Sequence, residues 1–263
     1  MIRIESLHRP ASTLSPPRAA HLHRQITRLR RDIADTLAWQ ALWSTSVDDH
    51  LKATDILDLA WEGDKLVGLL AERHLTLGGH KAVFIEKLMV DPTKQTEGLG
   101  RRLAGRSVLR TNLQWRGRDV FHVSRTTNPH VAAATWNGLR TGDAYYPSFD
   151  PARPARPDLI RAARELAASM WPDKKLHEDT GVIEGAFGSL LNEVPPTRHG
   201  DVARYFDAHV DRNRGDAILN VIRYGPRTWL RLLGYFQSHR LRRLWRRMRR
   251  RIPRQRTSPS NCR

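Results

Sequence analysis

The stretch from Glu86 to Leu103 joins a strand pattern, a glycine-containing turn and a helix pattern. The apolar run Val83–Val90 predicts the strand, which ends at Asp91-Pro92 because proline cannot donate to a ladder. The turn Gln95–Gly100 follows, and a helical spacing begins at Leu99. The first N–H groups of a helix have no internal partner, and glycines let an anion approach the backbone closely. This stretch therefore predicts a site for a pyrophosphate.

The positive charge of the chain is concentrated at its C-terminal end. The 263 residues carry a net charge of +18, and residues 217–263 contain fourteen Arg and no Lys, Asp or Glu, which leaves +4 for residues 1–216. The single cysteine, Cys262, excludes a disulfide framework and a thiolate metal cluster, and we expect no metal site. The sequence has neither a signal-peptide pattern at Met1 nor an apolar run of the ~18 residues that span a bilayer. We expect a cytoplasmic protein.

Hydrophobic periodicity predicts alternating strands and helices up to residue 225. The polar stretch Asp48–Thr54 is expected to end the first helical region, and the proline-rich stretch Tyr146–Pro157 is expected to be a surface loop. The glycine turns at 62–64 and 78–79 indicate three consecutive antiparallel strands that lead into the predicted phosphate turn. The expected strands are Ile2–Ile4, Ile56–Trp61, Leu66–Leu77, Lys81–Val90, Val120–Val123 and Asp216–Tyr224, and the expected helices are Ala19–Trp43, Leu99–Leu113, Asn128–Leu139, Leu159–Met170 and Val202–Val210.

The turn QTEGLG fits the [QR]-x-x-G-x-[GA] loop of the GNAT superfamily of acyl-CoA-dependent N-acetyltransferases. A strand ending in Leu-x-Val-x-Pro precedes the turn and a helix follows it, as in that family, so the chain resembles a GNAT enzyme. The alternative is an ordinary strand–turn–helix corner. The resemblance implies an α+β fold with a mixed, mostly antiparallel central sheet and helices on both faces. It covers residues 1–225, with an insertion at about 147–212.

The resemblance also implies how a cofactor is held. The co-substrate would be acetyl-CoA or another acyl-CoA. The backbone of the strand end would bond the pantetheine arm, and a bulge there would splay the strands and free an N–H for the thioester carbonyl. The turn and the two arginines after it would hold the pyrophosphate. The residues implied are Leu88, Met89, Val90, Gln95, Thr96, Glu97, Gly98, Leu99, Gly100, Arg101 and Arg102, with Asn128 as a further contact to the pantetheine.

Glu86 is the candidate base, because it resembles the Glu that takes a proton from the amine in many GNAT enzymes. Its place on an apolar strand predicts a pKa raised by desolvation. The alternative is that Glu86 only pairs with Lys87 or an arginine. Trp136 stands where the family has its general-acid Tyr and cannot donate an acidic proton, so we expect it to pack in the core. Either Tyr145 or Tyr146 supplies that proton, or solvent does.

The tail forms a second region, residues 226–263, which we expect to be a basic amphipathic helix with an arginine-rich end. Residues 227–256 would suit an anionic membrane surface, which implies peripheral membrane association, and nucleic acid is the less favoured partner. The predicted function is transfer of an acetyl group from acetyl-CoA directly to a primary amine of a small molecule or protein. Two alternatives stay open: a long-chain N-acyltransferase near a membrane, and a non-catalytic CoA-binding or tethering module.

Overall fold

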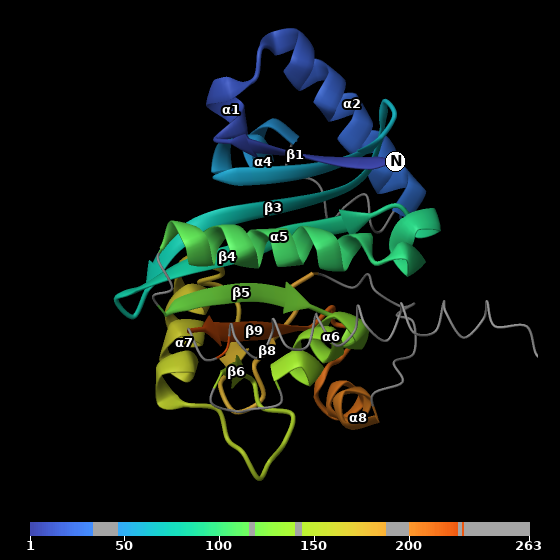
Figure 1. Cartoon of the computed structure of the whole chain (residues 1–263). Helices are drawn as coiled ribbons and strands as arrows, with labels where there is room; N and C mark the ends of the chain where they lie inside the picture. The colour runs from blue at the N-terminus through green and yellow to red at the C-terminus, as the bar shows by residue number, and fades with distance from the viewer. Residues whose placement is uncertain (34–46, 116–118, 140–143, 188–199, 226–227, 229–263) are drawn as a thin grey trace, which may run out of the picture.

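A single mixed sheet forms the centre of the protein (Figure 1). The computed structural model describes residues 1–33, 47–115, 119–139, 144–187, 200–225 and 228. The strand order is β1-β2-β3-β4-β5-β9-β8-β7, with β6 also paired to β9, and within the described residues β4 and β5 form the parallel pair. The strands are β1 (Ile2–His8), β2 (Ile56–Glu62), β3 (Lys65–Leu77), β4 (His80–Val90), β5 (Val120–Thr126), β6 (Tyr145–Tyr146), β7 (Leu176–His177), β8 (Val182–Ile183) and β9 (Ala217–Tyr224).

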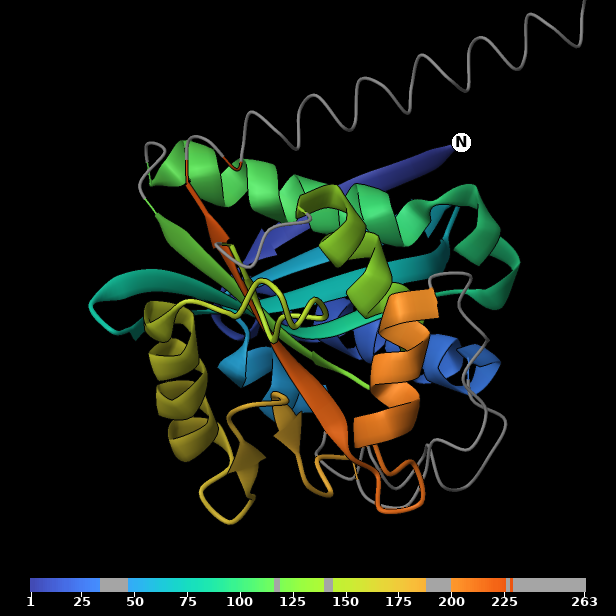
Figure 2. The ribbon, with the colours of Figure 1, turned by 90° about the horizontal axis from the view of Figure 1, so that it is seen from below.

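Helices cover both faces of this sheet (Figures 1 and 2). Because side chains alternate along a strand, neighbouring residues of β3 serve different layers: Leu69 packs with α2, and Leu70 packs with α5. Helices α5, α6 and α8 lie on one face, which we call the α5 face, and α2, α4 and α7 lie on the other, the α7 face. The helical segments are α1 (Pro10–Thr13), α2 (Pro16–Ile33), α4 (Val47–Ala53), the 3₁₀ turn η1 (Pro92–Glu97), α5 (Leu99–Gln114), α6 (Pro129–Leu139), α7 (Pro157–Met170) and α8 (Gly200–His209).

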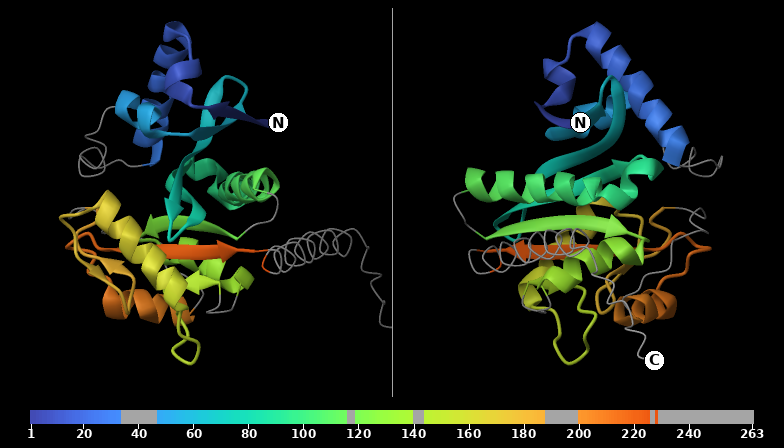
Figure 3. Two further views of the ribbon diagram at one scale, coloured as in Figure 1. Left: turned by 90° about the vertical axis from the view of Figure 1, so that its left-hand side faces the viewer. Right: turned by 45° about the vertical axis from the view of Figure 1, so that its right-hand side comes forward.

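The predicted fold class is confirmed: the protein is α+β, with a mostly antiparallel sheet between helices. Three antiparallel strands, a helix, a parallel strand and another helix follow one another as predicted, and Ala217–Tyr224 is a strand of the same sheet. The segment between β6 and β9 carries α7, β7, β8 and α8, which form one end of the molecule (Figure 3). The insertion therefore extends the sheet and covers its end.

Two predictions about local structure were wrong. The polar stretch Asp48–Thr54 does not end the helical region but forms most of α4, because Leu51 is buried against the sheet and the acidic Asp48 and Asp49 suit the positive end of a helix. Tyr146 is not part of a surface loop but pairs with β9 in the core. The predicted helix beyond Ile33 and the predicted basic helix and tail after Gly225 lie almost wholly outside the described residues. No described helix combines the length and the apolar character needed to cross a bilayer.

Candidate active site

The parallel strands β4 and β5 separate part-way along the sheet, and the candidate site lies where they separate. β4 and β5 pair from Lys81–Val120 to Ile85–Ser124, and there the ladder ends. Strand β4 continues to Val90 along β3 alone. Within the described residues, the edge of β4 that faces β5 therefore has no strand partner after Ile85. A gap between two splayed strands is the feature that the family resemblance implies for the pantetheine arm.

A β-bulge at Glu86 marks the point where the strands separate. On β3, Ala71 lies opposite Lys87 and Glu72 lies opposite Ile85, so Glu86 has no partner in the register. A bulge bends its strand and places two successive side chains on one face. Glu86 and Lys87 accordingly both reach the α7 face, where Glu86 meets α4 and Lys87 lines a hollow beside α2.

The start of α5 lies at the end of the same strand, on the α5 face. Gly98 has a φ of 77°, the left-handed conformation that glycine adopts without strain, and α5 begins with the next residue. Arg102 donates its N–H to the carbonyl of Gly98 at 3.1 Å, whereas the N–H groups of Leu99, Gly100 and Arg101 have no acceptor within the described residues. These three donors and the exposed side chains of Arg101 and Arg102 can hold a phosphate group.

The space at this corner suits a ligand. A Cβ built on Gly100 would lie 3.5 Å from Val90 and 3.8 Å from Leu88, which is ordinary contact and not a clash. Leu88 is an exposed apolar side chain, at 37% of its full accessibility, and it points toward the start of α5. Gln95 is exposed and donates its side-chain amide to the carbonyl of Val90 at 3.3 Å. The corner is therefore open and lined by main chain.

Glu86 is held in a positively charged environment. Its Oε1 lies 3.2 Å from Nδ1 of His50 on α4. Burial raises the pKa of Glu86, but the hydrogen bond with His50 and the charges of Lys87 and Arg73 together hold that pKa below its usual range. The predicted rise of the Glu86 pKa was therefore wrong, because the surrounding cations outweigh desolvation. The alternative reading, in which Glu86 pairs with neighbouring basic groups, describes this resting arrangement.

Lys87, Arg73 and Arg125 lie near this carboxylate, and Arg30 lies near Lys87. Burial lowers the pKa of Lys87 to about 7, Glu86 raises it, and the charges of Arg30 and Arg125 lower it further. Arg125, on β5, is the next residue after the last pair of the parallel ladder, so it lies across the gap from Glu86. Burial lowers its pKa to about 10, and Glu86 raises it. Basic groups from α2, β3, β4 and β5 thus gather at one end of the gap.

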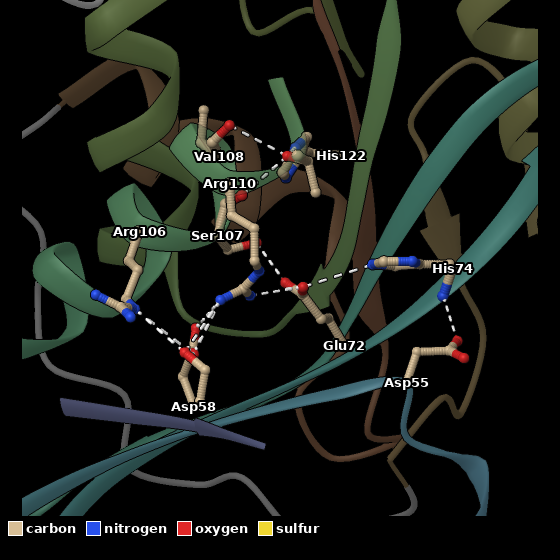
Figure 4. Close-up of polar contacts among 11 residues, drawn as sticks. Asp55, Asp58, Glu72, His74, Arg106, Ser107, Val108, Arg110 and His122 are labelled. Carbon is tan, nitrogen blue, oxygen red and sulfur yellow. Dashed lines mark hydrogen bonds and ion pairs between the residues drawn. The ribbon is translucent and has the colours of Figure 1, made fainter. Parts of the chain in front are cut away.

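A second group of charges lies between α5 and the sheet (Figure 4). Arg110 donates to Asp58 at 2.9 and 3.0 Å and to Glu72 at 2.6 Å, and Ser107 donates to Glu72 at 2.5 Å. Both carboxylates are fully buried. Burial raises the pKa of Glu72, but the hydrogen bond with His74, the charge of Arg110 and the bond from Ser107 leave it below its usual range. This cluster fastens α5 to β2 and β3.

The hydroxyls of the two predicted general acids, Tyr145 and Tyr146, are both hydrogen-bonded to protein acceptors. Tyr145 is fully buried, and its hydroxyl donates to Oδ1 of Asn220 at 2.7 Å. Tyr146 is also buried, and its hydroxyl donates to the carbonyl of Glu178 at 3.0 Å. Burial raises the pKa of both phenols above the usual range. Their expected role as proton donors is therefore at odds with their positions, since both hydroxyls are bonded inside the core.

Helix α6 begins just after β5. Asn128 caps this helix through a bond from the N–H of His130 to its Oδ1 at 2.9 Å, and Pro129 is the first helical residue, both as predicted. Trp136, farther along α6, packs edge-on against Tyr145, as its predicted place in the core requires. Thr96 belongs to η1 and Glu97 is exposed at its end. Met89 faces away from α5, into the layer beneath α2.

Lys87 was expected from the sequence as a possible partner of Glu86, whereas His50 and Arg125 were not expected beside it. His50 was placed in a polar stretch and not in a helix. Arg125 was left outside the strand, although the alternation of Phe121, Val123 and Arg125 would have placed all three on one face. That alternation, combined with a parallel register, was the signal that could have identified Arg125.

No protein-family model matches the chain, and no curated protein matches it. Among solved structures it is similar to a GNAT-family acetyltransferase from Streptococcus pneumoniae TIGR4, with 21% identity over 41% of this chain and 66% of that one, at a TM-score of 0.29. It is similar to Escherichia coli ElaA, with 20% identity over 51% of this chain and 86% of that one, at a TM-score of 0.39. An acyl-CoA N-acyltransferase from Pseudomonas aeruginosa matches with 19% identity over 52% and 86%, at a TM-score of 0.38.

Proposed function

We propose that the protein is an N-acetyltransferase that carries an acetyl group from acetyl-CoA directly to a primary amine. The proposal depends on one observation: strand β4 connects a gap in the sheet to the start of helix α5. Beyond Ile85, β4 leaves β5 at a bulge that contains a carboxylate, and the same strand leads through η1 to a helix start where three N–H groups have no acceptor within the described residues. An ordinary strand–turn–helix corner requires neither the gap nor the bulge.

In this proposal the cofactor lies on the α5 face and enters the gap. The N–H groups of Leu99, Gly100 and Arg101 bond the pyrophosphate, with the charges of Arg101 and Arg102 beside it. The free edge of Leu88–Val90 bonds the pantetheine arm, and Asn128 faces it from α6. An N–H of the bulged strand polarises the thioester carbonyl. Two observations support the fit of the pyrophosphate to this corner. The corner is open, because even a Cβ on Gly100 would make only ordinary contacts, and the three N–H donors have no acceptor within the described residues.

The chemistry takes place where the gap opens onto the α7 face. The amine nitrogen attacks the thioester carbon, and the carbon–sulfur bond breaks as the amide bond forms. Glu86 accepts the proton lost by the amine, directly or through water. The leaving thiolate takes its proton from solvent, because the hydroxyls of Tyr145 and Tyr146 are bonded within the core. Substituting Glu86 by Gln removes the acceptor while keeping the shape.

Two measurements test this function. Thermal unfolding with CoA, acetyl-CoA and palmitoyl-CoA should show stabilisation by CoA and acetyl-CoA. Thiol release from acetyl-CoA with a panel of amines should then fall by about 10²–10⁴-fold in Glu86→Gln. Glu178→Gln, which removes a carboxylate from an exposed pair with Arg164, is the matched control and should retain full activity. Undiminished transfer by Glu86→Gln would remove Glu86 from the mechanism.

The same measurements separate the alternatives. Stronger stabilisation and faster transfer with palmitoyl-CoA than with acetyl-CoA would favour a long-chain N-acyltransferase. Stabilisation by CoA without thiol release for any amine would favour a CoA-binding module. No stabilisation by any of the three would contradict the cofactor site itself.

A further inference from the structure

Two arginines beside Glu86 are partly buried and form no direct ion pair. About half of the described arginines form ion pairs, as Arg110 does with Asp58 and Arg214 with Asp216, and most of the others are exposed. Arg73 on β3 and Arg125 on β5 are only partly exposed, yet neither pairs with a carboxylate within the described residues. Glu86 attracts both guanidinium groups from beyond ion-pair distance, so each is half-buried without a direct ion pair.

The strand register places these arginines on one face, on either side of β4. Arg73 on β3 lies opposite Phe84 on β4, and Phe84 lies opposite Val123 on β5. Glu86 is two residues after Phe84, and Arg125 is two residues after Val123. Residues two apart share a face, so Arg73, Glu86 and Arg125 all lie on the α7 face. Both arginines meet the end of α7: Arg73 donates to the sulfur of Met170 at 3.9 Å, and Arg125 stacks on Trp171.

Arg125 is held in a fixed orientation. Its guanidinium carbon lies 4.6 Å from the ring centre of Trp171 and 4.5 Å from that of Phe187, and its Nη1 donates to the carbonyl of Ala186 at 3.0 Å. Stacking covers the faces of the guanidinium plane and leaves its edge donors for an acceptor in that plane. Within the described residues, Nε and Nη2 have no hydrogen-bond partner, and these two donors match the two oxygens of a carboxylate or phosphate.

We propose that the acceptor is an amine that also carries an anionic group, a carboxylate or a phosphate, and that Arg125 binds this group beside Glu86. The inference rests on the proposed function, since it concerns the second substrate of that site. Arg73 and Lys87 add positive charge on the same face. The field at this end of the gap therefore disfavours polycationic amines and attracts amines with an anionic substituent. Arg125 is a specificity-determining residue, because it contacts the part of the acceptor that does not react.

Matched pairs of amines test the inference. L-phenylalanine is compared with 2-phenylethylamine for the carboxylate, and phosphoethanolamine with ethanolamine for the phosphate. Wild type should show a kcat/KM at least tenfold higher for the anionic member of at least one pair, and the pair that shows it identifies the anion. Arg125→Met should bring that ratio close to one, mainly through KM, and Arg125→Lys should give an intermediate ratio because it keeps the charge without the planar fork.

The ratio of kcat/KM between the anionic and the neutral amine distinguishes substrate binding by Arg125 from a purely structural role. If Arg125 only packs against Trp171 and Phe187, Arg125→Met lowers the melting temperature and leaves the ratio unchanged, which would overturn the inference. Arg164→Met removes an arginine from the exposed surface of α7 and should leave both unchanged. Should no amine be turned over, thermal stabilisation by each amine in the presence of CoA replaces kcat/KM. Equal stabilisation by the anionic and the neutral amine of each pair would overturn the inference, and so would no stabilisation by the anionic amines while CoA itself stabilises; neither result would count against the cofactor site. No stabilisation by CoA would overturn the proposed function.

Discussion

Replacing Arg110 by methionine is expected to destabilise the protein strongly, because it removes the cation that contacts two buried carboxylates at hydrogen-bond distance, whereas Arg106 approaches only Asp58, at 3.8 Å. Arg110 is the side chain through which α5 contacts both Asp58 on β2 and Glu72 on β3, at distances of 2.6–3.0 Å. Methionine keeps most of the length and apolar volume of the arginine stem, so the loss reports mainly on charge. Neither carboxylate is exposed, so water cannot replace the guanidinium without opening the helix–sheet contact.

The magnitude follows from this burial. Removing one partner of a buried ion pair costs about 3–5 kcal/mol. Since domains of this size are stable by about 5–15 kcal/mol, the variant would lose a third or more of its stability. Arg164→Met is the matched control: Arg164 also approaches its carboxylate, Glu178, to 2.6 Å, but the two side chains are 62% and 40% exposed. An exposed pair contributes about 0–1 kcal/mol, so the control should unfold almost as wild type does.

The loss should also depend on pH. In wild type the pKa of Glu72 is lowered, so its stabilisation is present above the unfolded pKa of about 4.3 and is lost as pH falls through the folded pKa. Without Arg110, burial dominates and raises the pKa of the carboxylate, so the folded variant binds a proton more readily than the unfolded chain. The difference between wild type and variant should therefore be largest at pH 7 and shrink toward pH 5.

Urea unfolding followed by circular dichroism, at pH 7 and pH 5, measures both effects. Adding Glu72→Gln to Arg110→Met should recover part of the loss, because it removes one of the orphaned charges. A loss below about 1 kcal/mol, or one that is equal at the two pH values, would refute the view that Arg110 compensates buried charge.

Three further predictions concern the gap and its surroundings. Gly98→Ala should lose about 1–2 kcal/mol in urea unfolding because φ is 77°, whereas Gly100→Ala, with space for a Cβ, should change stability little; equal losses would contradict the assigned turn. Tyr145→Phe should cost about 1–3 kcal/mol by leaving the side-chain oxygen of Asn220 unbonded, with kcat unchanged within twofold; a hundredfold lower kcat in a folded variant would restore Tyr145 as the general acid. Lys87 should titrate near pH 7 by NMR of the isotopically labelled side chain. Because the unfolded chain binds this proton up to about pH 10, its contribution should make stability rise with pH above 7; titration near pH 10 would contradict the burial assigned to it.

The sequence predicted those parts of the fold that depend on local pattern. The order from Ile56 to Leu139 was correct, because turn glycines, a strand-ending proline and a capping asparagine each act within a few residues. The glycine turn before α5 belongs to the same class, because Gly98 is required by the backbone conformation at its own position. Helix α4 was missed because its apolar side, represented by Leu51, is too short to produce a periodic signal.

The rest depends on contacts between distant residues. The pKa of Glu86 was predicted from its own strand, but its direction is set by His50 on α4 and Arg73 on β3, which come from other parts of the chain. Tyr145 and Tyr146 were proposed as proton donors because Trp136 cannot serve, yet both belong to β6, which pairs with β9, and both hydroxyls are hydrogen-bonded to protein acceptors. Burial and charge at a site are tertiary properties, and one sequence does not specify which groups will meet.

The low pKa of Glu86 and the proposed anionic acceptor are linked by charge balance. In the resting protein, Lys87, Arg73 and Arg125 stabilise the carboxylate, which makes Glu86 a weak base. An anionic group bound to Arg125 would offset one of these charges when the amine arrives, and the bound substrates would displace water from around Glu86. Both changes raise the pKa of Glu86 toward the working range of a general base. A neutral amine of the same shape would leave the cations in place and find a poorer base, so the charge on the acceptor would contribute to kcat as well as to binding.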